Sequence, residues 1–194
     1  MLKMEEIVKA LEDDKINLIG VCGMGGVGKT TMVQEIAKRV KEKRLFMEVA
    51  TTAVGQKPDL IKVQACIAEM LGLKNLLDKE SEIVRGDRLR KRLQQATDDK
   101  KVLVILDDIW EKFDLLAMGI PLEYTNKNVK LLYTSRNQRL WGNLEIKREI
   151  PLELLSKVEA WQLFKEKTGE LADAPDCQPI AEKIVNECGR LPLL

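Results

Sequence analysis

The sequence contains no histidine, and this absence narrows the chemistry that the chain can perform. Serine–histidine catalysis, cysteine–histidine catalysis and histidine-ligated metal sites are excluded within it. Its four cysteines lack the spacing of a metal site, and nothing suggests a secreted disulfide framework. A reduced environment fits free cysteines better, so we expect a cytoplasmic location.

Net charge and long apolar runs are lacking as well. Lys and Arg number 32 and Asp and Glu number 31, which gives a net charge of +1. This balance argues against bulk electrostatic binding to nucleic acid or to an anionic membrane. No apolar run is long enough to span a bilayer, and the N-terminal residues show no signal-peptide pattern. At 194 residues there is room for one domain, or for one and part of another.

The most informative feature that is present is the string Gly-Met-Gly-Gly-Val-Gly-Lys-Thr at residues 23–30. It satisfies Gly-x-x-x-x-Gly-Lys-[Ser/Thr], the phosphate-binding loop (P-loop). The run 16–22 before it is typical of a buried strand, and apolar residues recur after it with a helical period. Strand, glycine loop and helix are the context that the motif requires.

Each part of this loop has a physical role in binding phosphate. Glycines let the backbone approach closely, its N–H groups form a concave nest for anions, and the following helix adds its N-terminal N–H groups. We expect Lys29 to reach the β- and γ-phosphates, Thr30 to bind Mg²⁺, and Thr31 to be a reserve ligand or an α-phosphate contact. The expected nucleotide-binding residues of the loop are Gly23, Gly25, Gly26, Val27, Gly28, Lys29, Thr30 and Thr31.

A second motif overlaps the first, because Gly23, Gly25 and Gly28 also fit the dinucleotide fingerprint. That motif requires an acidic residue about twenty positions later, at the end of the second strand. Glu48 is near that distance but lies inside the strand expected over 45–54. The dinucleotide interpretation also leaves the lysine and threonine of the loop unexplained, so we rank it behind the phosphate-binding loop.

The segment 101–108 is predicted to be a buried strand that ends in two carboxylates, Asp107 and Asp108. Ligands of open α/β sheets bind at the carboxyl ends of strands, where the Walker B aspartate of P-loop NTPases holds Mg²⁺. We expect Asp107 to face magnesium and Asp108 to orient or deprotonate a water, as the candidate catalytic residue. Without the loop upstream, a solvated acidic turn would be the better interpretation.

A third predicted strand, 129–134, leads into Arg136. A guanidinium group suits phosphate oxygens, so Arg136 could sense the terminal phosphate of a nucleotide. A single arginine after a strand is more often a surface residue, and the family resemblance given below is what favours the functional role.

The order of elements predicts an α/β fold, a P-loop NTPase parallel sheet with helices on both faces. Helices are expected near the N-terminus and over about 60–71 and 81–96, with a short connection over 110–121. From Ser156 the pattern becomes helical, with a capping box to Glu159 and a second helix that starts at Pro179. We expect a P-loop subdomain over 1–150 and the start of an all-helical subdomain over 151–194.

Together these motifs resemble the NB-ARC nucleotide-binding domain of plant disease-resistance proteins, in the branch with an N-terminal coiled coil. The order and spacing match over nearly the whole chain. The segments that carry the resemblance are the phosphate loop at 23–31, the acidic motif at 103–110 with its trailing Trp110, and the motifs at 130–136, 159–164 and 188–193.

The resemblance implies an ADP/ATP switch of a plant immune receptor, with at most slow ATP hydrolysis. In this family the ADP state is closed, and exchange for ATP opens and oligomerises the receptor. The implied partners are adenine nucleotide, other receptor domains and other protomers. Arg136 looks like the nucleotide sensor, and Pro192 like the residue that packs near the base. The Arg136 strand is expected between the phosphate-loop strand and the acidic strand.

The sequence also departs from the family pattern. Tyr133 stands where leucine is usual, Arg190 where glycine is usual, and Leu194 where alanine is usual. The chain ends before the second helical subdomain and its Met-His-Asp motif, so we expect a fragment or truncated member. Two alternatives follow: a degenerate nucleotide-binding scaffold whose site is idle, and a P-loop small-molecule kinase. We rank the kinase lower because no lid-like cluster of glycine or arginine is evident.

Overall fold

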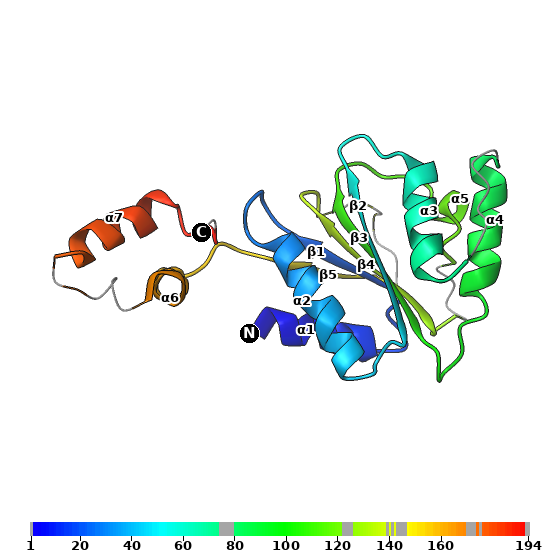
Figure 1. Ribbon diagram of the computed structural model, residues 1–194, viewed down its shortest axis with the longest axis horizontal. Helices are drawn as coiled ribbons and strands as arrows, with labels where there is room; N and C mark the ends of the chain where they lie inside the picture. The colour runs from blue at the N-terminus through cyan, green and yellow to red at the C-terminus, as the bar shows by residue number, and fades with distance from the viewer. Residues whose placement is uncertain are drawn as a thin grey trace.

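The computed structural model describes residues 2–73, 80–121, 126–138, 140, 142, 147–169, 174 and 176–192. Strands alternate with helices through the first three quarters of the chain, and two further helices follow (Figure 1). The elements are α1 (Leu2–Glu12), β1 (Leu18–Cys22), α2 (Lys29–Glu42), β2 (Glu48–Gly55), α3 (Leu60–Met70), α4 (Glu82–Leu93), β3 (Val102–Ile109), α5 (Leu115–Met118), β4 (Val129–Ser135), β5 (Lys147–Pro151), α6 (Lys157–Thr168) and α7 (Gln178–Glu187).

The five strands form one parallel sheet in the order β2-β3-β4-β1-β5. This confirms the predicted α/β class. The position predicted for the Arg136 strand is also confirmed, because β4 lies between the phosphate-loop strand β1 and the acidic strand β3. The carboxyl ends of β1, β3 and β4 therefore meet at one edge, which is where an open α/β sheet binds its ligand.

Alternate residues of the central strands bury into two separate apolar layers. Leu103 and Ile105 pack with α1 and α2 on one face, and Val104 and Leu106 pack with α3, α4 and α5 on the other. Figure 1 shows these two helical layers on opposite sides of the sheet. A strand covered on both faces needs apolar side chains at every position, which explains the unbroken run that predicted β3.

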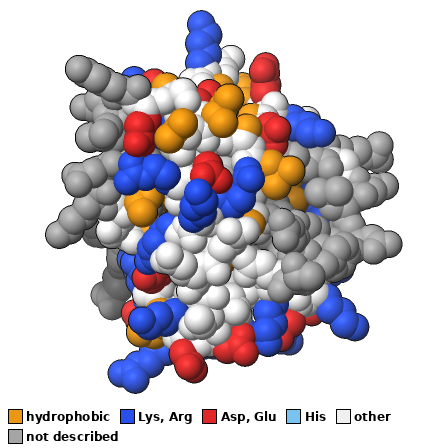
Figure 2. All heavy atoms as spheres, turned by 90° about the vertical axis from the view of Figure 1, so that its right-hand side faces the viewer, with side chains coloured by type: hydrophobic (Ala, Val, Ile, Leu, Met, Phe, Trp, Pro, Cys, Tyr) orange, Lys and Arg blue, Asp and Glu red, His pale blue; other side chains and the backbone are white. Residues whose placement is uncertain are grey.

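The helices begin at the capping residues that the sequence offers. Asp59 and Ser81 cap α3 and α4, accepting hydrogen bonds from the N–H groups of Lys62 and Val84. The outer surface of this layer carries apolar side chains among charged ones (Figure 2). Ile83 of α4, for example, is 79 % exposed. None of the described helices combines the length and the apolar character that crossing a bilayer requires.

Two elements went unpredicted. The segment expected as a plain connection contains the four-residue helix α5, which Asp114 caps and which ends at Gly119. The sequence also predicts no strand over 147–151, where β5 pairs with β1 at the sheet edge. Only Ile150 of β5 is buried, so the strand lacks the alternation that identifies a strand from sequence. A proline at the end of an edge strand is well tolerated.

Tyr133 of β4, the residue that replaces the usual leucine, has a side chain that crosses β1 to reach β5. It lies opposite Gly20 of β1, which in turn lies opposite Glu149 of β5. A Cβ on Gly20 would come within 2.4 Å of the Tyr133 hydroxyl oxygen, so only glycine leaves room for the ring. The hydroxyl group donates a hydrogen bond to Glu149 Oε1 at 3.4 Å. Burial raises the pKa of Tyr133, so the phenol stays protonated.

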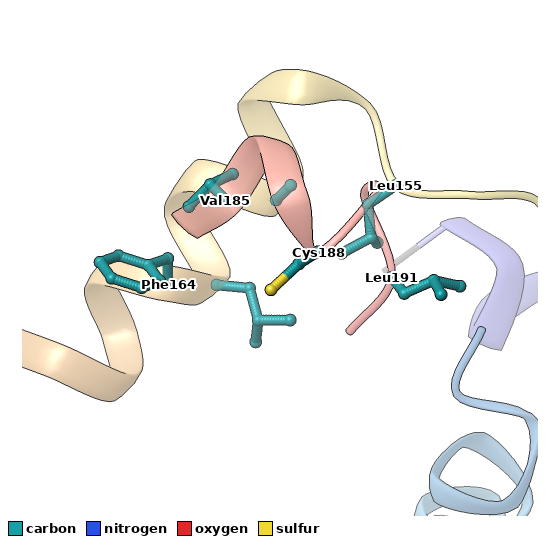
Figure 3. Close-up of a pocket in the computed structure, with 7 residues that line it drawn as sticks. Leu155, Phe164, Val185, Cys188 and Leu191 are labelled. Carbon is teal, nitrogen blue, oxygen red and sulfur yellow. The ribbon is translucent and has the colours of Figure 1, made fainter. Parts of the chain in front are cut away.

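The last two helices pack mainly on each other. The predicted capping box is confirmed, with reciprocal hydrogen bonds between Ser156 and Glu159 at the start of α6. Phe164 and Ala181 are the buried apolar residues between α6 and α7. Figure 3 shows Phe164, Val185 and Cys188 around a small cavity at this contact. We call residues 156–192, from the capping serine of α6 onward, the helical tail, and residues 2–152 the sheet region.

Candidate functional site

The glycine loop connects β1 to α2 at the edge where the central strands end. Gly28, at φ +92°, is the residue before α2, and an L-residue with a side chain would be strained there. Gly23 is required for a different reason, because a Cβ on it would come within 2.5 Å of the carbonyl oxygen of Leu152. Val27 is buried, whereas Thr30 and Thr31 are exposed.

Lys29 is buried at the first position of α2 and folds back over the loop. Its Nζ donates hydrogen bonds to the carbonyl oxygens of Gly23 and Met24, both at 2.8 Å. Burial lowers the pKa of Lys29, and the nearby Arg136 guanidinium lowers it further, while Asp108 and Asp107 oppose the shift. The predicted lysine, arginine and both aspartates therefore lie close enough to interact electrostatically.

Asp107 joins the acidic strand to the loop. Its Oδ2 accepts a hydrogen bond from Thr30 Oγ1 at 2.8 Å. Its Oδ1 accepts a second one from Thr134 Oγ1 at the end of β4. The side chain of Asp107 is thus on the same side of the sheet as Lys29, as a shared site requires, and both of its oxygens are oriented by hydroxyl groups.

A β-bulge gives the two aspartates their different directions. The register between β3 and β4 shifts between Leu106 and Ile109, so β3 has an extra residue here. Asp108 takes a positive φ of 57°, and its backbone N–H donates to Thr134 Oγ1 at 2.8 Å. Ser135 Oγ donates to the carbonyl oxygen of Ile109 at 2.7 Å and so satisfies this backbone group beside the bulge.

Thr134 and Ser135 are therefore site residues that the sequence reasoning missed. Both fell within the motif at 130–136, but only its arginine was assigned a role. The available signal was a pair of hydroxyl residues at the end of a strand expected next to the acidic strand. Hydroxyl groups in that place can replace ladder hydrogen bonds that a bulge removes.

Arg136 follows β4 and lies against the glycine loop. Its Cζ would be 3.3 Å from a Cβ on Gly25, so the guanidinium group rests on the loop backbone. The group also lies over the indole ring of Trp110, with Cζ 4.3 Å from the ring centroid. This is a cation–π contact. From the sequence, Trp110 is only a marker of the family branch, and this contact is not predicted.

Pro192 comes from the far end of the chain and also reaches the loop. Its Cγ would lie 3.3 Å from a Cβ on Gly28, at the residue that precedes α2. A backbone hydrogen bond from Leu155 N–H to the Arg190 carbonyl oxygen, at 3.1 Å, anchors the segment that carries it. The structure thus brings one residue of the helical tail to the predicted phosphate site.

The arrangement suits a polyanion with a hard cation beside it. Lys29 and Arg136 supply positive charge, and α2 presents its N-terminal N–H groups. Thr30 and Asp107 supply oxygen atoms, which are the ligands that Mg²⁺ prefers. Among the described residues no three His, Cys, Asp or Glu side chains gather as an all-protein metal site.

Comparison with known proteins extends these observations. The sequence profile of the NB-ARC domain family matches residues 2–174. Disease resistance protein SUMM2 of Arabidopsis thaliana is 31 % identical over 193 residues, which cover 98 % of this chain and 21 % of that protein. Disease resistance protein RPS5 of the same plant is 30 % identical, covering 99 % of this chain and 22 % of that protein. The chain thus spans about a fifth of the length of these relatives.

Solved structures with little sequence identity share the fold. A signal transduction ATPase with numerous domains (STAND) from Pyrococcus horikoshii, with a tetratricopeptide repeat sensor, superposes with a TM-score of 0.62. It is 17 % identical, and the match covers 97 % of this chain and 28 % of that one. The ORC2 protein of Aeropyrum pernix in its ADP form gives a TM-score of 0.57 at 17 % identity, covering 86 % and 50 %.

Proposed function

This chain belongs to the NB-ARC domain family, and from that premise we propose that it is the nucleotide switch module of a plant immune receptor, binding ADP or ATP with Mg²⁺. The observation that carries the proposal is the 2.8 Å hydrogen bond from Thr30 Oγ1 to Asp107 Oδ2. It joins the phosphate loop to the acidic strand, so one ligand could contact both.

In this proposal the loop of residues 23–31 surrounds the phosphates. Lys29 exchanges its two carbonyl acceptors, at Gly23 and Met24, for the β- and γ-phosphate oxygens. The exchange is favourable because an anionic acceptor forms a stronger hydrogen bond than a neutral carbonyl group. Thr31, exposed beside Thr30, contacts the α-phosphate or serves as a reserve ligand.

Thr30 and Asp107 are proposed to hold Mg²⁺, which when bound neutralises charge on the phosphates. Thr134 keeps the Asp107 carboxylate oriented toward this position. Asp108, displaced by the bulge, orients a water for hydrolysis that is slow at most. The slow rate is part of the proposal, because a switch must keep its nucleotide long enough to signal.

Arg136 is proposed to contact the terminal phosphate, and Pro192 to pack near the base. Loss of the γ-phosphate would remove the Arg136 contact and bias the position of the helical tail, which Pro192 connects to the loop. We propose subdomain boundaries at 1–150 and 151–194, with other receptor domains and protomers as partners. A cytoplasmic location and a role in defence belong to the same proposal.

The direct test is to purify the chain, denature it and identify any released nucleotide by chromatography. Co-purified ADP or ATP supports the switch. If no nucleotide is released, and neither ADP nor ATP with Mg²⁺ raises the melting temperature, the site is an idle scaffold. Rapid turnover that depends on an added phosphoryl acceptor would instead identify a kinase.

Lys29→Ala tests the same site by mutation. We expect it to abolish the rise in melting temperature that Mg²⁺-ADP or Mg²⁺-ATP produces, because the buried ammonium group is the main cation of the loop. Lys41→Ala is the matched control, since Lys41 lies on the same helix but is exposed. Full ADP affinity in Lys29→Ala would contradict the assignment.

A further inference from the structure

Trp110 has no part in the proposed function so far, yet it makes the most specific contact of Arg136. The residue follows β3 directly, two positions after Asp108. Its ring lies under the Arg136 guanidinium, with Cζ 4.3 Å from the centroid. Its indole N–H has no hydrogen-bond partner among the described residues, so the ring face, not the polar edge, makes the useful contact.

The contact leaves the hydrogen-bonding edges of Arg136 available. The five N–H donors of a guanidinium group lie in its plane, whereas a stacked ring occupies only its face. Within the described part of the chain, Arg136 forms no hydrogen bond or ion pair that would engage these donors, and the residue is exposed. Gly25 supports the group on the loop side without competing for the donors, because it has no side chain.

We propose that Trp110 is a positioning residue that holds Arg136 at the loop with its donors ready for the terminal phosphate of ATP. An unrestrained arginine must lose considerable side-chain freedom to bind a phosphate. Trp110 removes part of that loss in advance and so favours ATP over ADP. The inference rests on the proposed function, because it assigns the partner that Arg136 contacts.

The test compares the affinities for ADP and for a non-hydrolysable ATP analogue, both with Mg²⁺. Trp110→Leu is expected to weaken binding of the ATP analogue about twofold to fivefold, the range of an exposed cation–π contact, and to leave ADP affinity unchanged. Trp110→Phe keeps an aromatic face and is expected to retain most of the ATP affinity. In an Arg136→Ala background, Trp110→Leu is expected to have no further effect.

Two results would overturn the inference while leaving the proposed function intact. One is equal weakening of ADP and ATP binding by Trp110→Leu, which would make the residue merely structural. The other is the same loss of ATP affinity in the Arg136→Ala background, which would show that Trp110 acts without Arg136. If the unaltered chain binds neither nucleotide, the proposed function fails and the inference fails with it.

A fluorescence measurement decides the contact itself, independently of affinity. In a Trp141→Phe/Trp161→Phe background, Trp110 is the only tryptophan of the chain. Arg136→Ala is expected to change its emission, because a cation over the indole face is removed. Unchanged emission would contradict the stacking in solution. Circular dichroism of each variant establishes that the fold survives the substitution.

Discussion

The sheet region and the helical tail are ordered by different means. In the sheet region, apolar layers cover both faces of a parallel sheet, and many side chains in each layer are fully buried. Among the described residues of the helical tail, only Ala160, Phe164 and Ala181 are buried apolar residues, and Val158, Ile180 and Ile184 are exposed. Figure 1 shows α6 and α7 beside the rest of the molecule, joined to it by an extended segment.

The difference teaches that local signals can specify helices without supplying stability. The capping box of α6 and the proline at the start of α7 fix where these helices begin. Isolated helices of this length are marginal in water, and burial of an apolar face normally stabilises them. We therefore expect the sheet region to unfold as one unit and the tail to open at lower free energy.

The largest effect should come from a cavity in the sheet. Leu103 is fully buried in β3 between α2 and the neighbouring strands. Leu103→Ala is expected to lower the free energy of unfolding by about 3 kcal/mol, measured by urea denaturation followed by circular dichroism. Phe164→Ala, the corresponding change in the tail, is expected to leave this transition in place while α6 loses its amide protection.

A Val158→Ala variant is the control for the tail, because Val158 is exposed on the same helix. It should change neither the transition nor the protection of α6. If Phe164→Ala lowered the urea midpoint as much as Leu103→Ala does, the two regions would form one cooperative unit, and the contrast between them would be wrong.

A second expected effect, a pH dependence of stability, is confined to the sheet region, because all buried charged side chains of the described residues lie there. Lys130 is one of them: its Nζ donates to the carbonyl oxygens of Asp13 and Ile16 at the end of α1. Burial lowers the pKa of Lys130 from 10.5 to about 8. Between pH 8 and pH 10.5 the unfolded chain holds more protons at Lys130 than the folded chain does. The contribution of Lys130 to the free energy of unfolding therefore rises with pH.

The variant Lys130→Met should reveal this pH dependence of stability, because methionine carries no titratable group. Below pH 8 the lysine is charged in both states, and its burial penalty is fully present. As the pH increases from 8 to 9.5, we expect the unaltered chain to gain stability relative to Lys130→Met, toward a limit of about 3 kcal/mol above pH 10.5. Urea unfolding at several pH values measures the difference. A constant difference over this range would show that Lys130 keeps its ordinary pKa.

Much of the fold follows from contiguous sequence. The strand, glycine loop and helix at 16–44 needed only neighbouring residues, and the unbroken apolar run of β3 placed Asp107 and Asp108 at its end. Parallel topology then implied that the ends of β1 and β3 share an edge. The hydrogen bond between Thr30 and Asp107 agrees with that placement.

The parts that escaped prediction depend on registration between strands. Thr134 contacts both aspartates only because a bulge offsets β3 against β4. Trp110 meets Arg136 because two connections after neighbouring strands turn toward each other. The edge strand β5 buries one residue and so has almost no pattern of its own. None of these features is encoded in a periodicity or a spacing along the chain.

The smallest effect gives the sharpest comparison, because the same substitution can be made in both regions. Ser81 caps α4 in the sheet region, and Ser156 caps α6 in the tail. Each serine-to-alanine change removes a capping hydrogen bond, which typically contributes about 1 kcal/mol. Leu89 and Leu93 pack α4 into the core, so the loss at Ser81 should appear in global unfolding.

At Ser156 the loss of the capping hydrogen bond should lower only the local stability of α6. Amides of α6 should exchange about fivefold faster in Ser156→Ala, as a loss of about 1 kcal/mol of local stability implies, while the urea midpoint stays unchanged. Hydrogen exchange and urea denaturation on both variants separate the two outcomes. A lowered midpoint in Ser156→Ala would mean that the order of α6 contributes to the sheet region. The link would then run through the 153–156 segment and the Pro192 contact with the glycine loop.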